Sequence, residues 1–146
     1  MKEEIPPFFV DQAVRFSDVD MYRVVWHGRY VAWLEEARNG LASLAGFSLV
    51  GALDRGYRFP IVELSLGYKR PAQLGDTVRV FPRYQPEPIA RISFAYEIRK
   101  IDGGQLLASA VTRQMILRGD ELLVTMPPDV REILSKLERV QSAWPA

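Results

Sequence analysis

The sequence predicts an α+β domain in which one long helix packs against an antiparallel sheet. Residues from about 28 to 45 carry apolar side chains at helical spacing, and the chain after residue 56 is a series of β-rich runs divided by turn residues. The expected order is a strand, the long helix, about four strands and a short terminal helix. One apolar helix face and one apolar sheet face can bury each other, which is the α+β arrangement.

Five segments have the alternation or the composition of β-strands. Residues 9–16, FVDQAVRF, put Val10, Gln12, Val14 and Phe16 on one face, although the alternation is imperfect. The other four are rich in β-branched and aromatic residues and are separated by turn residues; they span residues 57–69, 77–84, 89–100 and 105–117. Pro82 indicates a sheet edge or a bulge, because proline cannot donate to a strand ladder.

The long helix is expected to begin near residue 28. Its apolar positions step by four and three residues and so share one face; they are Tyr30, Leu34, Ala37, Leu41 and Leu44. Gly40 inside the helix costs ~1 kcal/mol relative to alanine, so packing must hold this segment helical. Gly46 is the expected C′ residue, and Asp129 is a candidate N-cap for a terminal helix over residues 129–140.

Length and composition fit one globular domain spanning residues 1–146. The chain is 48% apolar and 25% charged, and its formal net charge of +1 gives no reason to expect nucleic acid or an anionic membrane as a partner. It has no cysteine and one histidine, which excludes disulfides and thiolate sites and argues against zinc. We expect no metal and no cofactor. We recognise no signal peptide or membrane-spanning segment, so we expect a cytoplasmic protein.

The segment 18-DVDMYRVVWHGRY-30 holds the candidate catalytic groups. An aspartate here is equally well explained as a helix N-cap. However, Arg23 stands three residues after Asp20, where a capping box needs Glu or Gln, and 24-VVW-26 is a poor helix opening. The helix therefore begins near His27 or Gly28, and the aspartates lie on the connection that leads to it. A carboxylate beside unpaired N–H groups supplies a base or nucleophile and an oxyanion site, which acyl transfer requires.

Three other side chains have competing interpretations. A lone histidine is more often structural than catalytic, but at the start of a helix the backbone N–H of His27 is an unpaired donor whatever its side chain does. Glu35 is expected to be a solvated surface charge, and Glu36 is a reserve candidate for a base.

The segment 16-FSDVDMYRVVWHGRYVAWLEEAR-38 resembles the signature of the hotdog-fold acyl-CoA thioesterases of the 4-hydroxybenzoyl-CoA thioesterase type. That signature runs D-x-D, a V-V-Y/W-H block, a tyrosine three residues later, and a helix carrying E-x-x-R. The segment 61-IVELSLGYKRPAQLGDTV-78 is similar to the second-strand pattern of the family, and 127-PPDVRE-132 matches a common ending. The resemblance covers almost the whole chain.

The resemblance implies a hotdog fold, in which a long central helix is wrapped by a five-stranded antiparallel sheet. It also implies homodimers or homotetramers with active sites between subunits, and hydrolysis of an acyl-CoA to a free acid and coenzyme A. Asp20 matches the catalytic aspartate, as general base or nucleophile. His27 matches the residue whose backbone amide polarises the thioester carbonyl. Tyr30 matches the tyrosine of the signature and is a substrate-binding candidate, although it also fits the core.

Further candidate substrate contacts come from basic side chains and from one position at which this chain departs from the family pattern. The phosphates of coenzyme A need cations, and the candidates are Lys69, Arg70 and Arg91. Most members of the family have glycine where this chain has Arg23. Either the turn is adapted for side chains, or the pocket differs in shape, with Tyr22 narrowing the acyl pocket and Arg23 meeting a polar acyl group. Two alternatives are a hotdog-fold hydratase or dehydratase and a non-catalytic acyl-CoA-binding protein.

Overall fold

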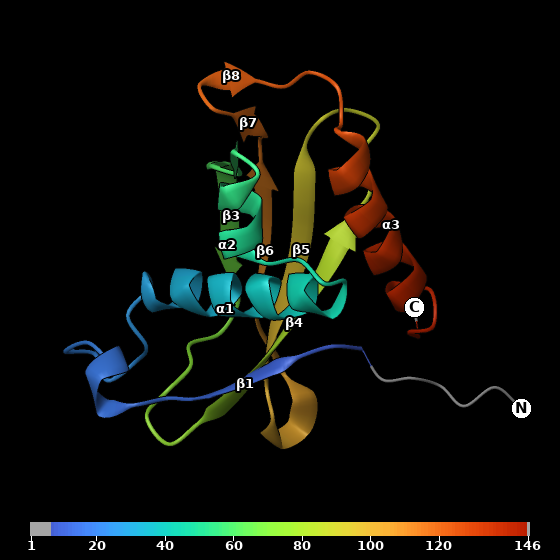
Figure 1. Ribbon diagram of the computed structural model, residues 1–146. Helices are drawn as coiled ribbons and strands as arrows, with labels where there is room; N and C mark the ends of the chain where they lie inside the picture. The colour runs from blue at the N-terminus through green and yellow to red at the C-terminus, as the bar shows by residue number, and fades with distance from the viewer. Residues whose placement is uncertain (1–6, 146) are drawn as a thin grey trace, which may run out of the picture.

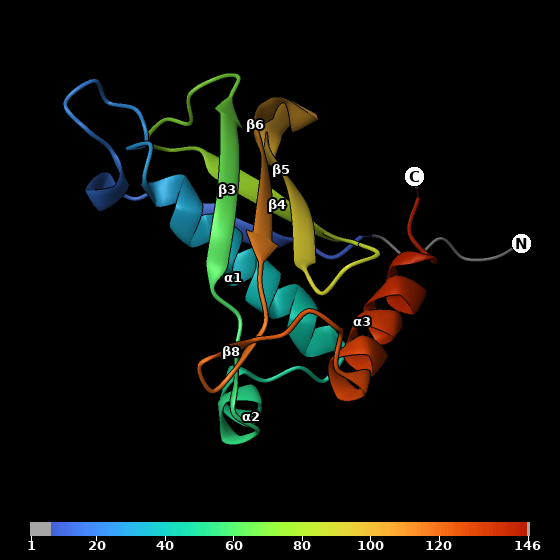
Figure 2. The same cartoon turned by 90° about the horizontal axis from the view of Figure 1, so that it is seen from above.

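The computed structural model describes residues 7–145, and its central feature is one helix lying across a sheet (Figures 1 and 2). Helix α1, Arg29–Leu44, covers one face of a five-stranded antiparallel sheet with the order β1-β4-β5-β6-β3. The strands are β1 Val10–Ala13, β3 Ile61–Tyr68, β4 Thr77–Gln85, β5 Ile92–Lys100 and β6 Leu106–Gln114. The predicted hotdog architecture, a long helix wrapped by a five-stranded antiparallel sheet, is therefore confirmed.

Smaller elements complete the chain. Helix α3, Pro128–Gln141, packs beside α1 and against β4, and the short helix α2, Leu49–Asp54, follows α1. A second sheet with the order β2-β7-β8 joins Tyr57–Arg58, Leu117–Arg118 and Glu121–Leu122, and single 3₁₀ turns span Phe16–Asp18 and Asp102–Gly104. This second sheet and α2 lie beyond one end of the main sheet, as the positions of β8 and α2 show (Figure 2).

The amphipathic pattern of α1 predicts most of its buried face. Tyr30, Leu34, Ala37 and Leu41 are buried as expected, but Leu44 is 51% exposed because the helix ends there. Gly46 has φ +78°, its N–H donates to Ser43 O, and the N–H of Phe47 donates to Ala42 O. These two bonds form a Schellman motif, so the predicted C′ glycine is confirmed.

Several predicted boundaries are wrong. Phe16 is not on the inner face of the first strand: β1 ends at Ala13, and Phe16 is 83% exposed in a 3₁₀ turn. The predicted strand over 57–69 is split at Pro60 into β2 and β3, and α2 was not foreseen. The N-cap of α3 is Pro127, while the Asp129 carboxylate accepts the hydroxyl of Tyr57 instead.

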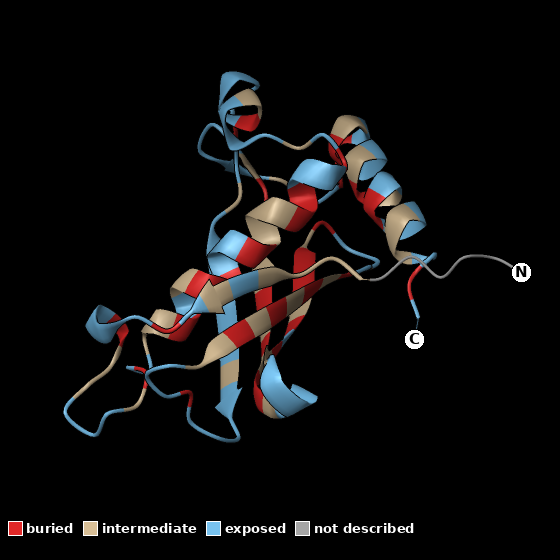
Figure 3. Cartoon of the chain, turned by 90° about the horizontal axis from the view of Figure 1, so that it is seen from below, coloured by how far each residue is buried: buried red, intermediate tan, exposed pale blue. Residues whose placement is uncertain are grey.

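Strand β3 is the long free edge of the main sheet. Within residues 7–145 its one strand partner is β6, and seven of its eight residues are exposed. Four large apolar side chains along it are exposed by 40–56%: Ile61, Val62, Leu64 and Tyr68. Figure 3 shows this strand almost entirely in the colour of exposed residues. An apolar edge of this length is a template for pairing with another chain.

Gly40 has a packing reason that the sequence does not show. A Cβ built on Gly40 would lie 2.7 Å from Cζ of Phe8, whose ring packs on the core next to the helix. The glycine therefore costs helix propensity but lets the N-terminal segment lie close to α1.

We expect Gly40→Ala to give less than the ~1 kcal/mol gain that helix propensity alone would supply, because the new methyl displaces the Phe8 ring. In a Phe8→Ala background the same change should stabilise the protein by the full ~1 kcal/mol. Urea unfolding of the four proteins of this double-mutant cycle measures the coupling, and a coupling of zero would contradict the packing account.

Candidate active site

Asp20 lies in a tight loop that leads from β1 to α1. Val19 and Val25 form a bridge, the N–H of Asp20 donates to Val24 O at 2.9 Å, and the N–H of Arg23 donates to Asp20 O at 3.0 Å. One carboxylate oxygen, Oδ1, accepts the N–H of Tyr22 at 2.8 Å. Within residues 7–145 no other hydrogen bond to this carboxylate is formed, so Oδ2 remains available to a ligand. The carboxylate borders an open hollow in front of the loop.

The tip of this loop retains the backbone geometry that a glycine would favour. Arg23 has φ +64° and is the one non-glycine residue with positive φ in the described part of the chain. An L-residue in this left-handed region is strained by roughly 1–2 kcal/mol. The turn is therefore not adapted for side chains. It keeps the left-handed conformation, and Arg23 carries the strain, with the side chains of Tyr22 and Arg23 exposed.

Asp18 has a different environment from Asp20. It is 3% exposed, and its carboxylate accepts the N–H of Arg15 at 2.8 Å and pairs with Nε of Arg29, the first residue of α1. Burial alone would raise the pKa of Asp18, but these two donors outweigh burial and lower it. Its own backbone carbonyl accepts the N–H of Trp26 at 2.7 Å. Asp18 therefore joins the loop to the helix and is not free for chemistry.

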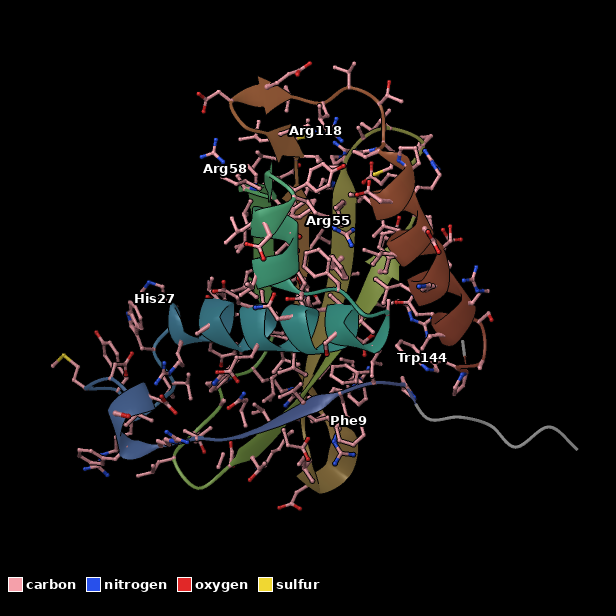
Figure 4. All side chains as sticks on the ribbon, viewed as in Figure 1. Phe9, His27, Arg55, Arg58, Arg118 and Trp144 are labelled. Atoms are coloured by element: carbon pink, nitrogen blue, oxygen red, sulfur yellow. The ribbon has the colours of Figure 1, made fainter. Side chains whose placement is uncertain are left out.

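The N-terminus of α1 presents unpaired backbone donors. The helix begins at Arg29, with Gly28 as N-cap, and no oxygen of residues 7–145 accepts from the N–H of His27 or Gly28. The side chain of His27 is exposed and projects from this end of the helix (Figure 4). Unpaired N–H groups at a helix start favour a developing negative charge.

Two aromatic residues fix this helix terminus. The indole of Trp26 lies over Gly28, where a Cβ would be only 2.7 Å from Cζ2 of the ring. The hydroxyl of Tyr68, at the end of β3, donates to the carbonyl of His27 at 2.6 Å. Sequence reasoning did not assign Tyr68, although this tyrosine is part of the second resembling segment. The bond ties the candidate oxyanion donor to the free edge strand.

The predicted cations do not all lie together. Lys69 and Arg70 are exposed and border the same hollow as His27 and Tyr68. Tyr30 forms the floor of that hollow. Burial raises its pKa, and its hydroxyl accepts the N–H of Ala72 at 3.2 Å, so that the group is committed to the core. Arg91 lies at the other end of the sheet, before β5, and is paired with Glu87.

The described residues contain no cluster of three metal-ligating side chains. Glu35 is exposed as expected, and Glu36 lies on the exposed side of α1. Among residues 7–145, no helix is long and apolar enough to cross a membrane.

Comparison with known proteins agrees with this geometry. Residues 14–134 match the thioesterase-like superfamily. A putative esterase of Synechocystis is 30% identical over 121 residues, which cover 80% of this chain and 71% of the relative. The chain belongs to the thioesterase-like superfamily. It is a thioester hydrolase with the hotdog fold.

Two solved structures share the fold of this thioesterase over most of its length. A hypothetical protein from Thermus thermophilus is 32% identical, with a TM-score of 0.80 over 88% of this chain and 98% of its own. A 1,4-dihydroxy-2-naphthoyl-CoA thioesterase from Synechocystis is 25% identical, with a TM-score of 0.80 over 90% of this chain and 97% of its own. Family membership favours thioester hydrolysis over the hydratase and the non-catalytic alternatives.

Arg23→Gly is expected to raise the free energy of unfolding of the thioesterase by up to about 1 kcal/mol. Relief of ~1–2 kcal/mol of strain exceeds the ~0.5–1 kcal/mol entropic cost of a glycine. Tyr22→Gly is the matched control and should destabilise, because Tyr22 has no positive φ to relieve. Urea unfolding measures both, and equal effects of the two changes would refute the strain at Arg23.

Asp18→Asn should lower the free energy of unfolding at pH 7 by about 2–3 kcal/mol, through the loss of hydrogen bonds to a charged group. Because the folded-state pKa of Asp18 is lowered, its stabilisation is present above the unfolded-state pKa near ~4 and is lost as pH falls through the folded-state pKa. The difference from wild type should therefore shrink towards pH ~3. Urea unfolding at both pH values tests this, with the exposed Asp54→Asn as control; a deficit that is independent of pH would contradict it.

Proposed function

We propose that this thioesterase hydrolyses acyl-CoA to a free acid and coenzyme A, with Asp20 as general base or nucleophile and the N–H of His27 as oxyanion donor. The observation that carries the proposal is the contrast between the two aspartates. Asp18 is buried, and its carboxylate is engaged by hydrogen bonds from Arg15 and Arg29. Asp20 has a carboxylate oxygen without a hydrogen-bond partner among the described residues, and it lies on the loop that leads to the unpaired N–H groups of α1. The cytoplasmic location expected from the sequence stays a prediction.

In this reaction the N–H of His27 donates to the thioester oxygen as it becomes an oxyanion, which is worth ~2.7–4 kcal/mol in comparable sites. In one route Asp20 takes a proton from water as the water oxygen adds to the carbonyl carbon. The intermediate then expels the coenzyme A thiolate, which takes up the proton. In the other route the carboxylate itself attacks, and water hydrolyses the resulting mixed anhydride. Both routes give the same products and use the same residues.

The working unit is proposed to be a homodimer, alone or within a tetramer, formed by pairing of β3 with β3 of a second copy. Its support is the long, exposed and apolar free edge of β3. Pairing would satisfy the unused backbone groups of that edge and extend the sheet across the two copies.

This pairing would also bring opposite ends of two protomers together. Ile61 and Tyr68 lie at opposite ends of β3, roughly 23 Å apart at ~3.3 Å per residue. Tyr68 is the last residue of β3, and its hydroxyl donates to the carbonyl of His27. In an antiparallel pair centred on β3, the Ile61 end of one protomer lies beside the end of the partner's β3 that carries Tyr68. Each oxyanion donor would thus lie beside the Ile61 end of the other chain, where Arg91 is also found.

Asp20→Asn should reduce kcat for a short acyl-CoA by at least ~100-fold, because an amide is a poor base and nucleophile. Acyl-CoA binding should persist, since a negative charge is removed. His27→Ala should cost less, because the backbone N–H remains. A colorimetric assay of thiol release measures all three proteins, and wild-type kcat in Asp20→Asn would overturn the assignment.

Leu64→Lys should convert the protein to monomers and abolish thioester hydrolysis. Leu64 lies near the middle of β3, so that two lysines would face one another across the twofold axis. Val124→Lys is the control, because Val124 is also exposed and apolar but lies outside β3. Sedimentation velocity and thiol release are measured on the same samples. An active monomer at assay concentration would contradict the proposal that the site is shared between two chains.

A further inference from the structure

A second cavity lies at the far end of α1 from His27. It has a volume of about 200 Å³, is partly open to solvent, and is bordered by α1, the segment leading to β3, the main sheet and α3. Its walls are mainly apolar, with Phe47, Phe59, Phe94 and Leu134 among them. Engineered apolar cavities of ~150 Å³ hold benzene, so this cavity has room for one substituted ring or a short acyl chain.

One wall of this cavity carries a guanidinium whose hydrogen-bonding capacity is almost unused. The side chain of Arg38 is only 11% exposed, yet its one hydrogen bond within residues 7–145 is a long one, 3.4 Å from Nη1 to the hydroxyl of Tyr96. Glu35 is 63% exposed and its carboxylate is 4.0 Å away, at the limit of an ion pair. Arg79, by contrast, bonds both oxygens of Asp11.

The neighbours of Arg38 do not neutralise it. Burial raises the pKa of Tyr96, and the Tyr96 hydroxyl is shared with Thr112 at 2.7 Å, so this contact is an uncharged one. Gln114, another polar group of the cavity, donates to Phe59 O. Nε and Nη2 of Arg38 have no hydrogen-bond partner in the described chain, and neither is fully enclosed. Arg38 is among the residues that line the cavity.

The position of the cavity connects it to catalysis in the partner. Along α1, the eleven residues from His27 to Arg38 correspond to about 16 Å, which is far for an acyl group bound within one chain. Ile61, however, lines the cavity and lies at the end of β3 that faces the partner's Tyr68 in the proposed dimer. An acyl group whose thioester is held by the partner's His27 would enter this cavity with its far end towards Arg38.

We propose that the cavity is the acyl site for the partner's catalytic centre, and that Arg38 selects acyl groups that end in an oxygen acceptor. This inference rests on the proposed thioesterase function and dimer. The favoured substrates are short or single-ring acyl-CoAs with a carboxylate or hydroxyl at the far end. A buried guanidinium binds such an oxygen strongly, and an unsubstituted acyl group would leave it unpaired.

The test compares matched acyl-CoA pairs of equal length: benzoyl-CoA against its 4-hydroxy and 4-carboxy derivatives, and hexanoyl-CoA against its ω-carboxy derivative. Wild type should favour the substituted member of each pair in kcat/KM. Arg38→Met should lower kcat/KM for the substituted members by roughly 10- to 100-fold, mainly through KM, and change the unsubstituted members by less than about threefold. The two kinds of derivative show whether the anchored oxygen is a hydroxyl or a carboxylate.

Tyr96→Phe is the matched control, because it removes the hydrogen bond to Arg38 but keeps the guanidinium in the cavity wall. It should retain the wild-type preference, whereas a merely structural Arg38 would make the two variants alike. If Arg38→Met does not fold, Arg38→Lys should show an intermediate preference, since a single ammonium replaces the planar guanidinium. Equal losses for both members of each pair, or no preference in wild type, would overturn the inference. Failure of wild type to hydrolyse any acyl-CoA would instead overturn the proposed function.

Discussion

The Asp18 carboxylate is the constraint on which the geometry of the candidate active site depends. It accepts the N–H of Arg15 on the chain leaving β1 and pairs with Arg29 at the start of α1, while its backbone carbonyl accepts the N–H of Trp26. One residue therefore fixes the exit of the strand, the return of the loop and the first turn of the helix. The relation between Asp20 and the His27 N–H therefore depends on the contacts of Asp18 as well as on their own bonds to the loop and to Tyr68.

The two aspartates of the D-x-D motif have different environments, one suited to a structural role and the other to a proposed catalytic role. Asp18 is buried and its pKa is lowered by its donors, so it is permanently charged and committed at neutral pH. Asp20, two residues later, makes one side-chain bond to the N–H of Tyr22 and keeps an oxygen free. The loop that presents it includes a left-handed arginine. Strain of this kind persists only where the surrounding structure holds it, and here the backbone bonds Asp20–Val24 and Arg23–Asp20 close the loop.

The sequence predicts the parts of this molecule that depend on local chemistry. The period of α1, the left-handed Gly46 and the strand composition follow from helix and strand geometry, and each is found in the structure. The features that the sequence does not predict lie at positions where tertiary contacts determine the local structure. Pro60 divides a β-rich run, Asp129 bonds Tyr57 and does not cap α3, and Gly40 accommodates a ring from residue 8.

The same division holds for the candidate site. The signature around residues 18–30 is contiguous, so Asp20 and His27 could be selected from the sequence alone. Tyr68 and Arg38 could not be, because their importance depends on which elements lie beside them. Tyr68 reaches the helix terminus across β3, and Arg38 faces a cavity built from four separate segments. No spacing in the sequence reports either contact.

In the proposed dimer, pairing along the free edge of β3 would bring together two half-sites that lie at opposite ends of each protomer. The Tyr68 end has unpaired N–H donors and the available carboxylate, but Tyr30 and Trp33 fill the core beneath it. The Ile61 end has an apolar cavity lined by a guanidinium with few hydrogen bonds. An antiparallel pairing of identical strands necessarily places unlike ends together. In the proposed dimer, activity is linked to association, because a monomer would carry both halves and no complete site. We therefore expect turnover per chain to fall when the protein is diluted below the dissociation constant of the dimer.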